Sequence, residues 1–229
     1  MDSIKTTCFL DFDHTLFNTD EFFHVDVRNS FLRFGIETQL WEQSYAAVWP
    51  KGYTLEKHVE EISRQSEIQL PLEEMKQVFF NNFSDLKQYL FTDVLSFLEN
   101  IKKKGVTTHL LSFGNPEWQR YKVHNSGISP YFESIFFTEK EGTKTEHIRK
   151  YSELFQQIIM VDNNSIELDL IKDTLPMTQT YFINRVPEEM LIPTDELTRL
   201  KFFDARNYVK KPQRHQHIAI KNLHDIIFL

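Results

Sequence analysis

The chain has 229 residues, a length that suits one domain of average size with a smaller insertion. Hydrophobic residues make up 41% of it, whereas there are only 6 glycines and 8 prolines, so the composition excludes a disordered or low-complexity chain. The net charge of -7 argues against nonspecific nucleic-acid binding, which needs a basic surface. It does not exclude a small anionic ligand, because a local pocket and a metal ion can override the net charge.

Cys8 is the single cysteine, which excludes an intramolecular disulfide and a metal site built from cysteines. Its place in an apolar run favours a buried thiol. Met1 leads directly into that run and leaves no room for a signal peptide, and no apolar segment approaches the ~20 residues that span a bilayer. We therefore expect a soluble cytoplasmic protein without a membrane partner.

The first apolar run starts near Ile4 and ends abruptly in Asp11-Phe12-Asp13-His14-Thr15. It predicts a buried strand. Because alternate residues of an extended chain share a face, Asp11 and Asp13 can approach one point at the carboxyl end of this strand. Two carboxylates that close repel each other unless a cation lies between them or one is protonated. The pattern fits either two solvated aspartates or a Mg²⁺ site with a nucleophilic carboxylate.

Residues 18–90 show no strand pattern and are predicted to be entirely helical. Apolar residues recur at spacings of three and four in stretches that begin near residues 19, 41, 55 and 71. Gly35 and Pro50-Lys51-Gly52 separate the first three stretches. The last stretch is expected to continue towards Leu90.

Strands and helices alternate in the rest of the chain. This alternation predicts right-handed βαβ units and a mostly parallel sheet, so the fold class is α/β. Strands are predicted over residues 106–111, 134–137, 158–161, 180–183 and 217–220. Helices are predicted after an N-cap at Thr92, from Asn115-Pro116 to Gly127, from Thr143 onward, and over residues 165–172, 191–200 and 222–228.

Polar residues end several of these predicted strands. In an open parallel sheet, the carboxyl ends of the strands gather at the crevice where ligands bind. We therefore expect a nucleophile, an acid or base, a hydroxyl group, a cation and metal ligands to meet there. The residues concerned are Asp11, Asp13, Ser112, Lys144, Asp162 and Asn163.

The order and context of these residues resemble the haloacid dehalogenase (HAD) superfamily. Its first motif, Asp-x-Asp-x-Thr after an apolar strand, matches the sequence that begins at Asp11. Its second motif, a Ser or Thr that ends the next core strand, matches Ser112. The third, a Lys at a helix start, matches Lys144, and the fourth, an acidic strand end, matches Asp162. The resemblance implies a Rossmann-like core over residues 1–17 and 91–229, with an inserted helical C1-type cap over residues 18–90.

The resemblance also implies a Mg²⁺-dependent phosphatase that acts on a small phosphorylated metabolite. Asp11 would attack phosphorus and form an aspartyl-phosphate. Asp13 would protonate the leaving oxygen and later deprotonate the attacking water. The phosphate oxygens would be held by Ser112, by the N–H groups of Phe113 and Gly114, and by Lys144. The metal ligands would be Asp11, the backbone carbonyl of Asp13, Asp162 and Asn163.

Some positions depart from the family pattern or leave alternatives. Asn163 stands where a second acid is common, and an uncharged ligand would weaken metal binding. Glu167 and Asp169 are expected on the surface of the following helix, although Glu167 can alternatively reach a metal-bound water. Lys140 competes with Lys144 for the third motif. Lys144 is favoured because Thr143-Lys144-Thr145 opens an apolar-periodic helix.

Two further features receive structural interpretations. His14 is expected to orient or pack the motif loop, and the stretch from Arg214 to His217 is expected to form a solvated turn. Within the family, Asp13 argues against a dehalogenase, which has no leaving oxygen to protonate. A phosphomutase, a phosphonatase and a noncatalytic HAD-like binding module remain the alternatives. The resemblance does not extend beyond about residue 185.

Overall fold

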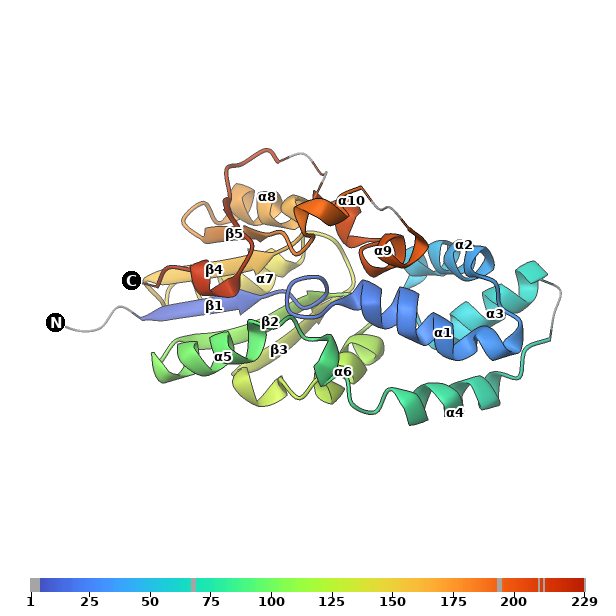
Figure 1. Cartoon of the computed structure of the whole chain (residues 1–229). Coiled ribbons are helices and arrows are strands. Elements are labelled where there is room, and N and C mark those ends of the chain that lie inside the picture. Colours follow the sequence, from blue (N-terminus) through green and yellow to red (C-terminus); the bar gives the residue numbers. More distant parts are fainter. Residues whose placement is uncertain (1–4, 67–68, 193–194, 210, 212, 229) are drawn as a thin grey trace.

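A six-stranded parallel sheet forms the centre of the computed structural model, which describes residues 5–66, 69–192, 195–209, 211 and 213–228 (Figure 1). The order across the sheet is β3-β2-β1-β4-β5-β6, and every neighbouring pair is parallel. This confirms the predicted α/β fold class. Ile4, near which the first apolar run starts, lies outside the described residues. The strands are β1 (Thr6–Leu10), β2 (Thr107–Phe113), β3 (Ser134–Thr138), β4 (Gln157–Asp162), β5 (Gln179–Ile183) and β6 (Ile218–Ile220).

Helices cover both faces of this sheet. Along β1, Cys8 and Leu10 belong to one hydrophobic core and Phe9 to a second one, because alternate side chains point to opposite faces. The first core includes residues of α5 (Val94–Lys103) and α6 (Pro116–Asn125), and the second includes residues of α7 (Lys144–Arg149) and α8 (Ser165–Thr174). Burial on both faces explains why these strands are continuous apolar runs.

The chain between β1 and β2 forms a helical region that extends beyond one end of the sheet (Figure 1). Its helical character was predicted, and the described part of residues 18–90 contains no strand. The expected extension towards Leu90 is wrong. The α-helix that begins at Leu72 ends at Asn82, and the Leu86 N–H donates instead to the Asn125 carbonyl at 2.9 Å. The elements are η1 (Glu21–Val27, a π-helix), α1 (Arg28–Phe31), η2 (Leu32–Phe34), α2 (Thr38–Val48), η3 (Trp49–Lys51), α3 (Leu55–Ser66), α4 (Leu72–Asn82) and η4 (Lys87–Tyr89).

The connection from β5 to β6 contains η6 (Glu188–Met190), α9 (Glu196–Lys201) and α10 (Ala205–Val209). We call residues 195–209 and 211 the α9–α10 segment. Its helix α9 packs against η1, so this segment lies beside the helical region (Figure 1). The helix predicted over residues 191–200 is confirmed in the part that α9 covers, while residues 193 and 194 lie outside the described part. The strand predicted over residues 217–220 is confirmed as β6.

Two predicted features near the helix ends are wrong. No helix closes residues 222–228, where only the 3₁₀ turn η7 (Leu223–Asp225) forms, because the following chain is extended and the Ile227 N–H donates to the Tyr181 hydroxyl. The helix α5 follows Asp93 rather than a Thr92 cap. The Asp93 side chain does not cap α5 either, since it accepts hydrogen bonds from Arg185 and from the Leu223 N–H. By contrast, Asn115 caps α6 as predicted.

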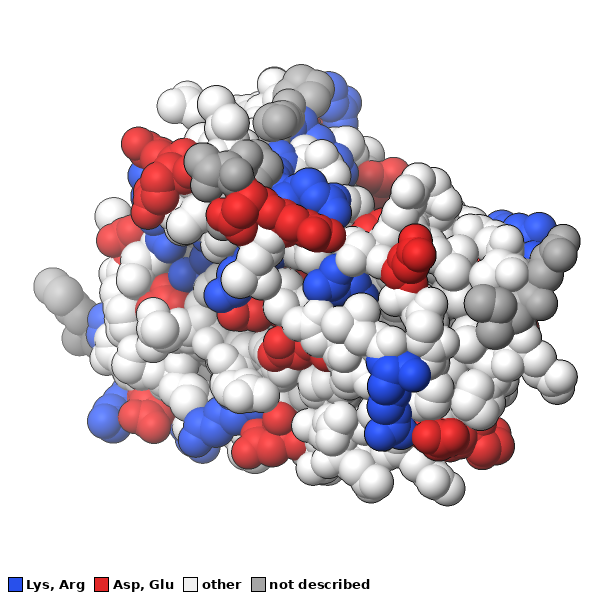
Figure 2. All heavy atoms as spheres, turned by 45° about the vertical axis from the view of Figure 1, so that its right-hand side comes forward, with Lys and Arg blue, Asp and Glu red and all other residues white. Residues whose placement is uncertain are grey.

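The described helices include none that combines the length and the apolar character needed to cross a membrane. On the face drawn in Figure 2, acidic and basic side chains are intermixed, and they form no continuous basic area. This distribution agrees with the modest negative net charge of the chain.

Candidate active site

A cavity of about 230 Å³ lies where the carboxyl ends of the strands meet the helical region and the α9–α10 segment. This is the edge at which a parallel sheet is expected to bind ligands. Side chains from distant parts of the chain line it. Among them are Asp11, Asp13 and Asp162 after the strands, Phe22 and Trp49 of the helical region, and Tyr208 of the α9–α10 segment.

Lys144, the first residue of α7, connects two of these carboxylates. Its Nζ lies 2.8 Å from Asp11 Oδ1 and 2.7 Å from Asp162 Oδ2, and all three side chains are buried. Burial by itself favours the neutral amine, but the two carboxylates raise the pKa of Lys144 above its usual value. Lys140 is exposed. Of the two lysines considered for the third motif, the structure therefore brings Lys144 to the acids.

The same surroundings alter the titration of Asp11. Burial raises the pKa of Asp11 to about 7, and the nearby negative charge of Asp162 acts in the same direction. The Lys144 ammonium opposes both effects. Two carboxylates and one ammonium in a buried place leave an excess of negative charge, which a further cation would offset.

Glu167 on α8 is buried, with 3% of its surface exposed, so its predicted place on the helix surface is wrong. Its Oε1 accepts the Gly142 N–H at 2.9 Å, whereas its Oε2 is buried without a hydrogen-bond partner among the described residues. Burial raises the pKa of Glu167. The helix turns this acid towards the cavity that Asp11 and Asp162 also line.

The oxygen atoms at this end of the cavity fit a magnesium ion. Carboxylates from Asp11, Asp162 and Glu167 line the cavity together with Asn163, and Mg²⁺ prefers oxygen ligands. The unpartnered Glu167 oxygen is a donor that a cation would use. Both groups considered for completing the metal site, Asn163 and Glu167, are therefore present, and Glu167 supplies the charge that Asn163 lacks.

Asp13 is held by three donors from other parts of the chain. Its Oδ1 accepts hydrogen bonds from Thr19 Oγ1 and from Lys122 Nζ, and its Oδ2 accepts one from Gln119 Nε2 at 2.6 Å. Burial alone would raise the pKa of Asp13, but the Lys122 ammonium and these hydrogen bonds hold it below its usual value. Asp13 is therefore ionised at neutral pH.

Sequence reasoning missed both Gln119 and Lys122. They lie three residues apart on α6, on one face of the helix, and both are 1% exposed. The only signal for them in the sequence was a pair of polar residues at helical spacing inside a stretch with an apolar face. That signal does not reveal a partner 106 or 109 residues away.

The three predicted phosphate-binding residues at the end of β2 behave differently. Phe113 lines the cavity, whereas Ser112 and Gly114 are not among the described residues that line it. The Ser112 hydroxyl is fully buried without a hydrogen-bond partner in the described part of the chain. The Gly114 N–H donates to the Thr138 carbonyl at 2.9 Å, so the prediction that it is free to bind phosphate is wrong.

Gly114 has a steric role that the sequence did not indicate. Its φ is +136°, and a Cβ added there would lie 2.6 Å from the Gln119 Nε2 atom. The same Gln119 nitrogen donates to Asp13 and to the Phe113 carbonyl. A glycine is therefore needed for the Gln119 side chain to pass β2 and reach Asp13.

A comparison with known families now places these residues in context. Residues 8–166 match the family described as haloacid dehalogenase-like hydrolases. The chain belongs to this family. The match ends before the α9–α10 segment, and no match to the chain is found among curated proteins.

Solved structures share the fold of this family member at low sequence identity. The L-2-haloacid dehalogenase from Xanthobacter autotrophicus is 16% identical, with a TM-score of 0.63 over 97% of this chain and 96% of that chain. A haloacid dehalogenase-like hydrolase of Burkholderia xenovorans is 15% identical, with a TM-score of 0.67 over 97% and 95% of the two chains. A predicted phosphoglycolate phosphatase from Haemophilus somnus is 12% identical, with a TM-score of 0.52 over 80% and 87%. At these identities the likeness is one of fold.

Beyond the family match, Asp169 anchors the chain before β6. It is 2% exposed rather than on the surface, and it accepts the N–H groups of Arg214 at 2.9 Å and His215 at 2.8 Å. It also contacts the ring of His217, which is 7% exposed and lies 2.8 Å from the Thr180 hydroxyl on its other side. The predicted solvated turn is therefore wrong at His217. Burial alone would raise the pKa of Asp169, but these donors lower it.

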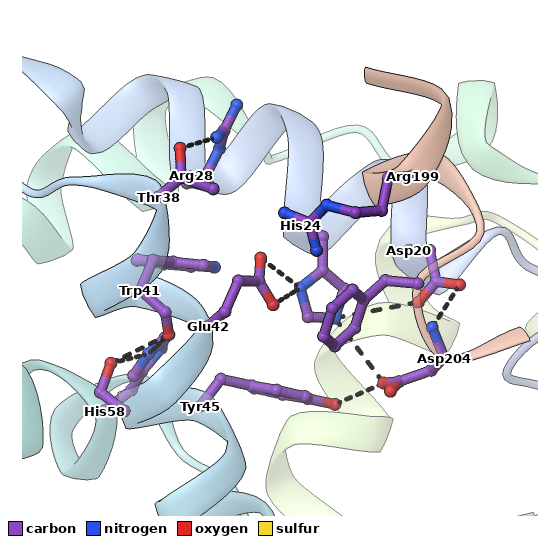
Figure 3. A network of polar contacts seen from close by, with 12 residues as sticks. Asp20, His24, Arg28, Thr38, Trp41, Glu42, Tyr45, His58, Arg199 and Asp204 are labelled. Carbon is purple, nitrogen blue, oxygen red and sulfur yellow. Dashed lines mark hydrogen bonds and ion pairs between the residues drawn. The ribbon is translucent and has the colours of Figure 1, made fainter. Parts of the chain in front are cut away.

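His24 of η1 is buried among carboxylates, one of which, Asp204, lines the cavity (Figure 3). Its Nδ1 lies 3.0 Å and 2.9 Å from the two oxygens of Glu42, and its Nε2 lies 3.8 Å from Asp20 and 3.6 Å from Asp204. Burial alone would lower the pKa of His24, but these carboxylates raise it to about 10. Burial raises the pKa of Asp20 to about 6. The α9–α10 segment thus contributes a charged group, Asp204, to the cavity wall.

His14 lies in the same wall. It lines the cavity, and its Nδ1 is 3.8 Å from Asp20 Oδ2. Among the described residues other than glycine, it alone has a positive φ, at 58°. Residues other than glycine adopt this conformation at some energetic cost, so the motif loop holds the imidazole in place at the expense of backbone strain.

Proposed function

We propose that this chain is a Mg²⁺-dependent phosphomonoester hydrolase that acts on a small phosphorylated metabolite through an aspartyl-phosphate on Asp11. The observation that supports it most is that Asp11 and Asp13 line one cavity while Lys144 contacts Asp11. The reaction needs a nucleophile, a group that moves a proton, and positive charge beside the phosphoryl oxygens. These three residues supply one each.

Asp11 is the nucleophile in this mechanism. Lys144 donates to its Oδ1, which orients the carboxylate and leaves Oδ2 to form the bond to phosphorus. When the phosphorus–oxygen bond of the substrate breaks, the electron pair goes to the leaving oxygen, which takes up a proton. Lys144 also offsets the charge that gathers on the phosphoryl group.

Asp13 and Lys122 together transfer the proton that the leaving oxygen takes up and the proton that the attacking water releases. The Lys122 ammonium donates to the ionised Asp13, and burial lowers the pKa of Lys122. A proton can therefore pass from Lys122 through Asp13 to the leaving oxygen. In the second step Asp13 accepts a proton from the water that attacks the aspartyl-phosphate, and it returns this proton to Lys122.

Magnesium would be held by oxygen atoms of Asp11, Asp162, Glu167 and Asn163, with the Asp13 carbonyl as a further ligand. When bound, it supplies positive charge that binds and polarises the phosphate. The buried, unpartnered oxygen of Glu167 supports its place in this set. The three carboxylates of this set, from Asp11, Asp162 and Glu167, supply the negative charge that attracts a divalent ion.

The helical region would act as the cap, over residues 18–90, and residues 1–17 and 91–229 as the core. The cavity of about 230 Å³ is smaller than the ~300–1,000 Å³ of a site for a drug-sized ligand, which favours a small substrate. Phe22 and Trp49 of the cap line the same cavity as Asp11 and Lys144. They would exclude water and contact the leaving group.

A haloacid dehalogenase is the second candidate, and one observation favours it. Three donors hold Asp13 in its ionised form. Displacement of a halide from carbon by Asp11 needs no proton on the leaving group, so an ionised Asp13 would not hinder it. Halide release from a 2-haloacid, measured beside phosphate release, separates the two candidates.

The experiment that tests the proposal is phosphate release from a panel of phosphorylated metabolites in Mg²⁺. The wild type is compared with Asp11→Asn and with Asp225→Asn, a matched change at an exposed acid. We expect activity in the wild type and in Asp225→Asn, its loss in Asp11→Asn, and its loss in all on addition of EDTA. Equal activity in Asp11→Asn would refute the role of Asp11, and no phosphate release from any substrate would refute the phosphatase.

A further inference from the structure

A second group of side chains of metal-ligating types lies beside the proposed magnesium ligands, with none of those side chains in common. It consists of His14 in the motif loop, Asp20 just before η1, and Asp204 in the α9–α10 segment. One possible ligand atom from each lies within 4.8 Å of the others. Asp20 is fully buried, and His14 is 6% exposed. His14 and Asp20 are near neighbours in the sequence, but Asp204 follows Asp20 by 184 residues, so it is the tertiary structure that brings the third residue to the other two.

Several polar atoms in this group are buried and lack a hydrogen bond. His14 Nδ1, Asp20 Oδ1 and His24 Nε2 have no hydrogen-bond partner in the part of the chain that the structure describes. Buried polar atoms in folded proteins nearly always make hydrogen bonds, and two of these atoms belong to residues of the group itself, His14 and Asp20, so a ligand held between them would satisfy both. Carboxylate oxygens and imidazole nitrogens converge there, so that ligand is a cation.

His24 is oriented as a metal-binding histidine is. In Figure 3 its ring lies between Glu42 on one side and the pair Asp20 and Asp204 on the other. Its Nδ1 contacts both Glu42 oxygens, and its Nε2 faces the two aspartates at 3.8 Å and 3.6 Å. A carboxylate on one ring nitrogen, with the other nitrogen directed at the site, is the arrangement that fixes the tautomer and orientation of histidine ligands.

The site also carries excess negative charge. Asp20, Asp204 and Glu42 are three carboxylates beside two imidazoles, those of His24 and His14. Even with both imidazoles protonated, two positive charges face three negative ones. A divalent ion would remove this imbalance.

We propose that His14, Asp20 and Asp204, with His24 as a fourth donor, form a binding site for a divalent transition-metal ion. Imidazole nitrogen selects zinc, cobalt and their neighbours over magnesium, which prefers an all-oxygen set. The site is therefore chemically distinct from the one around Asp11. Neighbouring ligand atoms of a tetrahedral zinc site lie about 3.3 Å apart, so the four donors would draw together on binding.

The bound ion would tie the α9–α10 segment to the rest of the cavity wall. Asp20 Oδ2 already accepts the N–H groups of Asp204 at 3.0 Å and Ala205 at 2.9 Å, which brings the segment to η1. A shared ion would add bonds between the motif loop, the helical region and this segment. The site thus has both a structural consequence and a position on the substrate cavity.

Cobalt(II) is the probe for the test, since it binds to both kinds of site and its spectra report the ligands. The metal-free full-length chain is titrated with Co²⁺ by equilibrium dialysis, and hyperfine-shifted proton spectra are recorded. We expect two ions per chain, and exchangeable imidazole N–H signals shifted by the metal. The proposed magnesium ligands contain no histidine, so imidazole N–H signals with large contact shifts indicate the second site, and the variants below distinguish them from shifts that an ion at the first site causes through space.

Variants then assign the second ion. Asp204→Asn should bind one ion and lose the shifted imidazole signals. Glu42→Gln should lower the affinity for the second ion by about 10–100-fold. Asp225→Asn, at an exposed acid, should bind as the wild type does. The proposal is overturned if saturating Co²⁺ shifts no imidazole signal, or if Asp204→Asn retains both ions. Phosphatase activity enters neither readout, so this test stands apart from that of the proposed function.

Discussion

Replacing Lys144 with methionine removes the only positive charge that contacts Asp11 and Asp162 within the described residues. Methionine has a similar length and no charge, so the change leaves two buried carboxylates without their partner. We expect the variant to be less stable than the wild type and to lose activity. Lys140→Met is the matched control, because Lys140 is exposed and precedes Lys144 by only four residues.

The structure sets the size of the expected effect. Removing one partner of a buried ion pair costs about 3–5 kcal/mol. For a chain of 229 residues, where each kcal/mol shifts Tm by about 2–4 °C, Tm should fall by about 6–20 °C. Lys140→Met should cost less than about 0.5 kcal/mol, as exposed substitutions usually do. Loss of charge stabilisation at the phosphoryl group should lower kcat by about 10²–10³-fold.

The pH dependence of the loss provides a second check. Burial raises the pKa of Asp11 to about 7 even with Lys144 present, and removal of the ammonium raises it further. The folded variant therefore binds a proton that the unfolded chain releases near pH 4. Its stability must fall as the pH rises from about 4 towards the folded-state pKa, so the deficit should be greater at pH 8 than at pH 5.

Urea unfolding of both variants in EDTA at pH 5 and pH 8 measures this free energy directly. Phosphate release in Mg²⁺ measures the effect on kcat. If Lys144→Met and Lys140→Met unfold at the same urea concentration and retain equal activity, the bridging role of Lys144 is refuted. If the loss of unfolding free energy in Lys144→Met is the same at pH 5 and pH 8, the raised pKa of Asp11 is not its cause.

Three further predictions concern other parts of the molecule. Lys122→Met should raise the pKa of Asp13, so that activity is lost at a higher pH on the acid side of the pH–rate profile; an unchanged profile would contradict the proton pathway. Gly114→Ala should cost about 1–3 kcal/mol, measured by urea unfolding, because the new Cβ meets Gln119 and φ is strained; a wild-type midpoint would contradict this. Asp169 has a lowered pKa, so its contribution to stability is present above about pH 4 and is lost as the pH falls through its folded-state pKa; Asp169→Asn should flatten this acid dependence, and a curve parallel to that of the wild type would count against it.

Local sequence patterns were enough to predict the sheet and most of its helices. The apolar runs and the glycine and proline stops are short-range signals, and they follow directly from the alternation of strands and the 3.6-residue repeat of helices. The same patterns led to the acid pair after β1, because residues two apart on a strand must share a face. These patterns wrongly predicted a helix at residues 222–228. The extended chain there is bound by the Tyr181 hydroxyl of β5, which lies 46 residues earlier in the sequence.

The surroundings of those acids depend on contacts that no local pattern encodes. The donors to Asp13 on α6 become visible only when β2 places that helix beside β1. Burial of Glu167 depends on how α8 packs against the sheet. The sequence alone does not show which neighbours cover the face of α8 that carries Glu167. Asp204 meets Asp20 across 184 residues of chain. The sequence by itself determined most of the elements and the residue types of the candidate site, whereas the tertiary structure decided their partners and electrostatic surroundings, because electrostatic interactions act through space rather than along the chain.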